Sequence, residues 1–139
     1  MATITRFEEL ECWQLARELD SGVFPITKKG ELSRDFKMRD QILSSCGSIM
    51  DNIAEGFDRD GNREFSQFLS IAKGSAGELR SQLHRALDRN YISKEEFESL
   101  HKKTEIVAGK IFGLMSYLAD CEMKGTKFKN RISPLNSKP

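Results

Sequence analysis

The fold class follows most directly from the stretch Ile71-Ala72-Lys73-Gly74-Ser75-Ala76-Gly77-Glu78-Leu79, read together with Asp51-Asn52-Ile53-Ala54-Glu55-Gly56. Both stretches place small residues and a carboxylate inside segments whose apolar residues recur with helical spacing. A glycine in a helix interior costs roughly 1 kcal/mol relative to alanine. Glycines kept at such positions indicate close helix packing, a special polar site, or both.

The segments before and around the second stretch predict two helices. The first starts at a predicted capping box, Thr5-x-x-Glu8, and its apolar residues run towards Pro25. The second covers about residues 34–56 and includes Phe36 in its apolar stripe. The polar link 27–31 separates them. No proline interrupts the chain between Thr27 and Ser133, which favours an all-α fold.

Two further helices follow in the second half of the chain. The third is expected to have Asn62 as its N-cap and to continue to about residue 90, where Tyr91-Ile92 closes it. The fourth opens at a capping box, Ser93-x-x-Glu96, and carries a heptad seam that ends at Cys121. Long helices joined by short links predict an up-down-up-down antiparallel four-helix bundle.

Length and composition are those of one globular domain. The chain has 139 residues, 38% of them hydrophobic and 31% charged, so it can bury a single core. We expect the bundle to span residues 1–123. Residues 122–139 contain five basic residues and one acidic residue, a net charge of +4. We expect residues 124–139 to form a basic, disordered tail, either solvated or binding phosphate.

The cellular compartment is predicted from what the sequence lacks. No apolar run approaches the roughly 20 residues that span a bilayer, and the N-terminus lacks the apolar stretch of a signal peptide. The three cysteines, Cys12, Cys46 and Cys121, are widely spaced and contain no Cys-x-x-Cys pair. We therefore expect a cytoplasmic protein with no membrane partner, whose cysteines are small buried side chains in a reducing environment.

A hairpin between the second and third helices places Gly74, Ser75 and Ala76 level with the segment 44–48, which is also rich in small residues. This register predicts that the two helices approach closely there. Leucine at position 74 or 75 should then cost several kcal/mol through overpacking. Apolar residues outside the fourth helix's seam, Ile106, Phe112 and Met115, indicate either contact with another subunit or a wider core contact.

Several motifs recur in a fixed order over about residues 6–120. They are Phe7-x-x-Leu10-x-x-Trp13-Gln14-x-Ala16, Gln41, Ser48-Ile49-x-x-Asn52-Ile53-Ala54-Glu55-Gly56, Phe65-x-x-Phe68-Leu69-x-Ile71-Ala72-x-Gly74-Ser75-x-x-Glu78-Leu79 and Tyr91-Ile92. Through these motifs the chain resembles the bacterial four-helix bundle proteins encoded in intervening sequences of 23S ribosomal RNA genes. That family is similar to the accessory variability proteins of diversity-generating retroelements, which form pentameric barrels that bind nucleic acid and a reverse transcriptase.

The resemblance implies a four-helix bundle that assembles as a homopentamer. It implies a reverse transcriptase partner only if the gene belongs to a retroelement. The positions that match the family signature are Asn52, Glu55, Gly56, Gly74, Ser75 and Glu78. The family assigns no catalytic role to them, so we carry them over as signature positions alone.

Enzyme chemistry finds little support in the sequence. The hairpin register separates Glu55 from Glu78 along the bundle, which argues against a paired-carboxylate site. A di-metal bundle normally needs two Glu-x-x-His pairs, whereas this chain has two histidines in all and one such pair, Glu98-x-x-His101, off the inward seam. We therefore expect no catalytic residue, no metal and no cofactor.

Binding of RNA or DNA is the most specific function that the sequence supports. The candidate phosphate-binding residues lie in the third helix and the first link, and they are Lys73, Arg80, His84, Arg85, Arg89, Lys28 and Lys29. Fivefold repetition would turn them into a charged ring, whose contacts to phosphate would be salt-dependent and weakly sequence-specific. The alternatives are a solvated basic face and a structural scaffold for protein partners without a nucleic-acid role.

Overall fold

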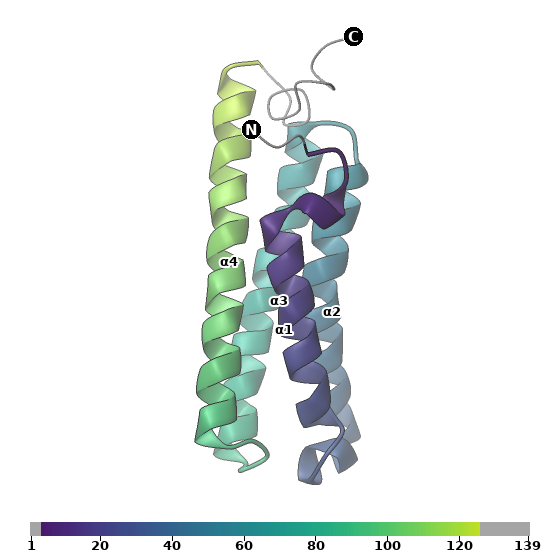
Figure 1. Cartoon of the computed structure of the whole chain (residues 1–139), viewed down its shortest axis with the longest axis vertical. Coiled ribbons are helices and arrows are strands. Elements are labelled where there is room, and N and C mark those ends of the chain that lie inside the picture. Colours follow the sequence, from purple (N-terminus) through teal and green to yellow (C-terminus); the bar gives the residue numbers. More distant parts are fainter. Residues whose placement is uncertain (1–3, 126–139) are drawn as a thin grey trace.

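The computed structural model describes residues 4–125, which contain four long helices and no strand (Figure 1). The helices are α1 (Glu11–Thr27), α2 (Phe36–Asp58), α3 (Asn62–Asp88) and α4 (Lys94–Met123). Two short 3-10 helices, η1 (Phe7–Glu9) and η2 (Glu31–Arg34), precede α1 and α2. The predicted all-α fold is confirmed. The predicted basic tail lies, from residue 126 onward, outside the described residues.

The four helices lie side by side, and successive helices run in opposite directions (Figure 1). Each packs against the next in the chain, and α1 also packs against α4, so that the helices enclose one core. The α1–α2 and α3–α4 links lie at the same end of the bundle, which is the lower end in Figure 1. The α2–α3 link lies at the opposite end. Short links between long helices favour this antiparallel arrangement.

The core is built from the apolar stripe of each helix. In α4 the buried residues follow the predicted heptad seam, from Leu100 through Thr104 to Cys121. Thr104 is accommodated because its hydroxyl donates to the Leu100 carbonyl oxygen at 2.7 Å. Phe36, which we expected in the stripe of α2, is 63% exposed, and its ring instead lies under the guanidinium of Arg39.

One of the three predicted N-caps forms as expected. Ser93 and Glu96 make the full capping box at the start of α4. The predicted capping box at Thr5 is wrong, because η1 lies between Thr5 and α1, which begins at Glu11. The Thr5 backbone N–H donates to the Glu9 carboxylate instead of to Glu8. Asn62 is also not an N-cap. It is the first residue of α3, after Gly61, whose φ of 106° is accessible mainly to glycine.

The predicted close approach at Gly74 is wrong. A Cβ at Gly74 would have no atom within 4 Å, and the same holds for Gly47 and Gly77. The close approach lies instead at Gly56, where a Cβ would fall 2.6 Å from the Cβ of Phe68. Hydrophobic spacing identified the two helices that meet but not which glycine faces the neighbouring helix.

Candidate nucleic-acid interface

A polar groove runs between α2 and α3, with a volume of about 730 Å³. Its lining is dominated by serine hydroxyls, side-chain amides and four charged groups. The residues are Lys37, Asp40, Gln41, Ser44, Ser45, Ser48, Ser75, Glu78, Ser81, Gln82 and Arg85. The predicted pairing of the two small-residue segments holds to within about one helical turn, since Ser75 meets Ser48 where the register placed it level with Ser45. The small residues there leave space between the helices.

The upper end of the groove is closed by a hydrogen-bonded serine pair. The hydroxyls of Ser48 and Ser75 lie 2.8 Å apart, joining α2 to α3. Asn52 donates its side-chain amide to the Ser48 carbonyl oxygen at 2.8 Å and to the Ser48 hydroxyl at 2.9 Å. Two signature residues, Asn52 and Ser75, therefore act on the same serine and fix the register of the hairpin.

The two signature carboxylates, Glu55 and Glu78, lie in different parts of the bundle and make different contacts. Glu55 forms an exposed ion pair with Arg59 at 2.7 Å, whereas Glu78 lines the groove. The Asn52 amide does not bond Glu55, one turn further along α2, but is directed to Ser48. Among residues 4–125 no cluster of three or more histidine, cysteine or acidic side chains could hold a metal ion.

The predicted basic residues of α3 divide between two faces. Lys73 and His84 lie on the side of α4, where the Lys73 ammonium is 5.9 Å from the centre of the Phe112 ring. The His84 ring packs against Phe97 and His101, with ring centres 4.8 and 5.2 Å away. The His84 ring is thus partly covered by the aromatic rings of α4.

Arg80 differs from the other candidates in its environment. Its Nε atom is buried and has no hydrogen-bond partner among the residues that the structure describes. Arg80 follows Lys73 by seven positions and precedes His84 by four, which places it on the same face of α3.

The remaining candidates lie at the end of the bundle that holds the α1–α2 and α3–α4 links. Arg85 lines the groove, and its Nη2 is 3.5 Å from the Gln41 amide oxygen. Arg89 lies 3.6 Å from Asp35. Lys29 is bound to Glu96 at 2.6 Å, and Lys28 lies over the Phe24 ring. The structure thus brings Lys28, Lys29, Arg85 and Arg89 to one end, with some already paired.

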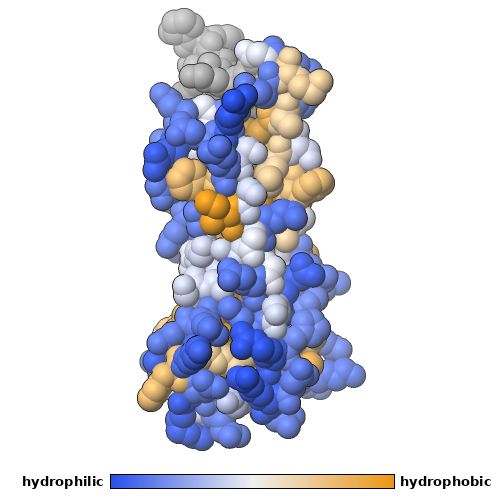
Figure 2. All heavy atoms as spheres, turned by 180° about the vertical axis from the view of Figure 1, so that it is seen from behind, coloured by the Kyte–Doolittle hydropathy of each residue, from blue (hydrophilic) through white to orange (hydrophobic). Residues whose placement is uncertain are grey.

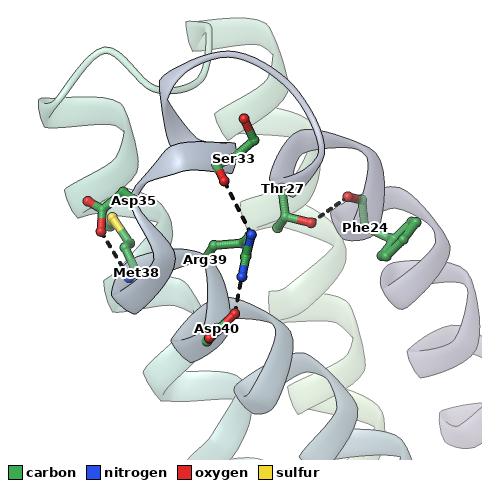
Figure 3. A network of polar contacts seen from close by, with 7 residues as sticks. All are labelled: Phe24, Thr27, Ser33, Asp35, Met38, Arg39 and Asp40. Atoms are coloured by element: carbon green, nitrogen blue, oxygen red, sulfur yellow. Dashed lines mark hydrogen bonds and ion pairs between the residues drawn. The ribbon is translucent and has the colours of Figure 1, made fainter.

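Asp35 organises this end. It caps α2 by accepting from the Met38 backbone N–H at 3.2 Å (Figure 3), and it also accepts from the Tyr91 hydroxyl at 2.8 Å. The bonds from Tyr91 and Met38, with Arg89 nearby, hold the pKa of Asp35 below its ordinary value of 3.8. The sequence offered a signal for the cap, an aspartate directly before a helix, but none for the contact with Tyr91.

The first turns of α2 hold a second polar network (Figure 3). Arg39 donates to the Ser33 carbonyl oxygen at 3.3 Å and to the Asp40 carboxylate at 3.1 Å. Asp40 therefore reaches the groove with its charge already balanced by Arg39. Lys37 is different: no ion pair involves Lys37 or Arg85 anywhere in the described chain.

The face of the molecule drawn in Figure 2 differs in hydropathy between its two ends. Figure 2 shows a largely hydrophilic lower end, and apolar patches gathered over the other half. Exposed apolar side chains of α3 and α4 include Ile71, Ile106 and Phe112, at 53%, 43% and 58% exposure. No described helix has the length and apolar character needed to cross a membrane.

Comparison with known proteins agrees with this fold. The family model for 23S rRNA-intervening sequence proteins matches residues 8–113. A solved structure from Bacteroides thetaiotaomicron, described as a protein of unknown function from the S23 ribosomal protein family, superposes with a TM-score of 0.69. It is 22% identical, and the match covers 75% of this chain and 97% of that one. No curated protein matches the chain.

Proposed function

The chain belongs to the family of 23S rRNA-intervening sequence proteins, and we propose that it is a non-enzymatic protein that binds nucleic acid through phosphate contacts. One observation carries the proposal. Lys37 and Arg85 flank an open polar groove at the basic end of the bundle, and neither takes part in an ion pair within residues 4–125. Unpaired cations beside a groove attract phosphate without reading base sequence.

The candidate contacts are not equal in strength. Lys28 and Arg85 keep their charge available, while Arg89 is shared with Asp35. Lys29 is balanced by Glu96, so we expect it to contribute little. The whole chain has a net charge of only +1, so binding depends on this local concentration of positive charge rather than on the total.

The test is a fluorescence anisotropy titration with a single-stranded oligonucleotide, beginning at about 50 mM salt, where phosphate contacts are strong. We expect affinity to fall steeply as salt rises. Replacement of Lys37 and Arg85 by glutamine should weaken binding and reduce the salt slope by about 0.7 for each phosphate that the variant no longer neutralises. Arg59→Gln, at the opposite end of the bundle, is the matched control. Undetectable binding at the lowest salt overturns the proposal.

We further propose that the protein works as a homo-oligomer, with a pentamer as the leading assembly. Exposed Ile106 and Phe112 on α4 support this proposal, because apolar side chains at a subunit contact are removed from water. With a chain mass of 15.8 kDa, a pentamer has a mass of about 79 kDa by light scattering. Phe112→Glu should lower that mass. The control is Phe24→Glu, which replaces an exposed side chain of α1 and should leave the mass unchanged.

The same apolar residues favour a second candidate function, that of a scaffold for protein partners. The two functions separate in one experiment. An oligomer that binds no oligonucleotide at low salt would support the scaffold and exclude the phosphate-binding role. Salt-dependent binding that requires Lys37 and Arg85 would support the first proposal.

A further inference from the structure

Gln82 of α3 lines the α2–α3 groove and carries a hydrogen-bond acceptor that the described residues leave unused. Gln82 is 7% exposed, and its Oε1 atom is buried with no donor among the described residues. Gln82 also lines the groove. A buried acceptor without a partner costs roughly 1–3 kcal/mol. A donor group that enters the groove would recover that free energy once the Gln82 side-chain amide rotates to present Oε1 to it.

The groove walls add further acceptors around Gln82. The carboxylates of Asp40 and Glu78 accept hydrogen bonds only, and the Gln41 amide oxygen accepts as well. Serine hydroxyls can donate or accept, so they adapt to whichever group lies opposite. The two cations lie at the lower end of the groove, because Lys37 is in the first turn of α2 and Arg85 is in the last turn of α3. The groove therefore offers cations at one end and mainly acceptors along its floor.

We infer that the groove binds the backbone of single-stranded RNA in preference to DNA, with 2′-hydroxyl groups donating to Gln82 and phosphates facing Lys37 and Arg85. This inference rests on the proposed phosphate-binding function and adds the class of polymer. Phosphate oxygens accept hydrogen bonds but cannot donate them. The 2′-hydroxyl is the donor that an RNA backbone has and a DNA backbone lacks.

The dimensions of the groove fit a strand rather than a duplex. The helical rise between Lys37 and Ser48 is about 16 Å, so the groove is long and follows the helix axes. Packed helices have axes about 8–10 Å apart, which leaves a furrow too narrow for a double helix. A single strand with a phosphate at the cationic end can place the hydroxyl of a neighbouring sugar against the acceptors of the floor.

The test compares three oligonucleotides of one sequence in the same low-salt titration: RNA, DNA and 2′-O-methyl RNA. The last retains the sugar oxygen but has lost its donor hydrogen. We expect RNA to bind on the order of 5-fold more tightly than either of the others, the ratio that corresponds to one net hydrogen bond. Equal affinities for RNA and DNA, or equally tight 2′-O-methyl RNA, overturn the inference but not phosphate binding.

Two variants locate the effect in the groove. Gln82→Met removes the buried acceptor while keeping the length of the side chain, and it should bring the RNA-to-DNA affinity ratio close to 1. Ser45→Ala is a second variant of the floor, used if Gln82→Met melts below the unmodified protein. An unchanged ratio in a folded Gln82→Met protein overturns the inference, and absence of binding to all three oligonucleotides overturns both proposals.

Discussion

A methyl group on Gly56 of α2 would lie 2.6 Å from the Cβ of Phe68 of α3. Real Cβ atoms do not approach one another so closely, and the Phe65 carbonyl oxygen, at 3.3 Å, would be a second tight contact. The absence of a side chain at this position therefore lets α2 and α3 meet just before their link. This contact explains the signature glycine by packing.

The first prediction follows from this contact. Gly56→Ala should lower the free energy of unfolding by about 1–3 kcal/mol, the usual range for overpacking. Gly74→Ala is the matched control, because a Cβ there meets nothing within 4 Å. It should raise stability by up to about 1 kcal/mol through helix propensity. Urea unfolding of both variants checks the pair, and a Gly56→Ala protein as stable as the parent would refute the packing account.

The second prediction concerns the bond between the Ser48 and Ser75 hydroxyls. Ser75→Ala should cost about 1 kcal/mol, since it leaves the partly buried Ser48 hydroxyl with one partner fewer. A double-mutant cycle with Ser48→Ala should show a coupling free energy of about 0.5–1 kcal/mol. Additive effects of the two substitutions would mean that the hydroxyl pair contributes nothing to the hairpin.

Hydrophobic periodicity gave the number of helices and the facing segments of α2 and α3. The heptad seam from Leu100 to Cys121 is a repeated, redundant signal, so it survives an error at any one position. The choice between Gly56 and Gly74 was not predictable in this way. Both lie in helical patterns, and whether a glycine faces its neighbour depends on a rotation of a few tens of degrees.

The candidate site was predictable in residue type but not in grouping. Lys73, Arg80 and His84 recur at steps of seven and four, which places them on one face, and Arg85 and Arg89 share another. That division could have been found from helical spacing alone. Two contacts had no local pattern from which they could be predicted. Asp35 and Tyr91 are separated by 56 positions in the sequence, and Lys29 and Glu96 by 67.

The third prediction concerns acid stability. The folded pKa of Asp35 is held below 3.8, first by the Tyr91 hydroxyl. Its stabilising contribution is therefore present above pH 3.8 and is lost as the pH falls through the lower folded pKa. Asp35→Asn should reduce the melting temperature at pH 7 and remove part of its decline below pH 4. Parallel acid profiles of parent and variant would show that Asp35 is not responsible.

Tyr91 gives an independent measurement of the same contact. The hydrogen bond to Asp35 raises the pKa of Tyr91 above its ordinary value of 10.0. Its contribution is present below pH 10 and is lost as the pH rises through the folded pKa. Spectrophotometric titration should place one tyrosine of the parent above the normal range, and Asp35→Asn should return it. If both tyrosines of the parent titrate in the normal range, the contact is excluded.

The fourth prediction compares a helix cap with a surface ion pair. Ser93→Ala should cost about 1 kcal/mol, because the Glu96 backbone N–H loses its acceptor. Lys29→Ala should cost well under about 1 kcal/mol, although its ion pair is short, because the Lys29 side chain is 61% exposed. Thermal unfolding in parallel ranks the two. A larger loss for Lys29→Ala would mean that the link depends on charge more than on the cap.

The fifth prediction concerns the three cysteines, all of which are buried. Burial raises the pKa of the Cys12 and Cys46 thiols to about 12, so almost no reactive thiolate is present at pH 8. A thiol reagent should therefore modify these cysteines in the native protein only as fast as the helices open. In urea all three should react within minutes. The native rate should rise in Gly56→Ala, since that substitution weakens the α2–α3 contact and populates the open state. Native labelling that is fast and unaffected by Gly56→Ala would show that α1 and α2 expose their thiols without unfolding.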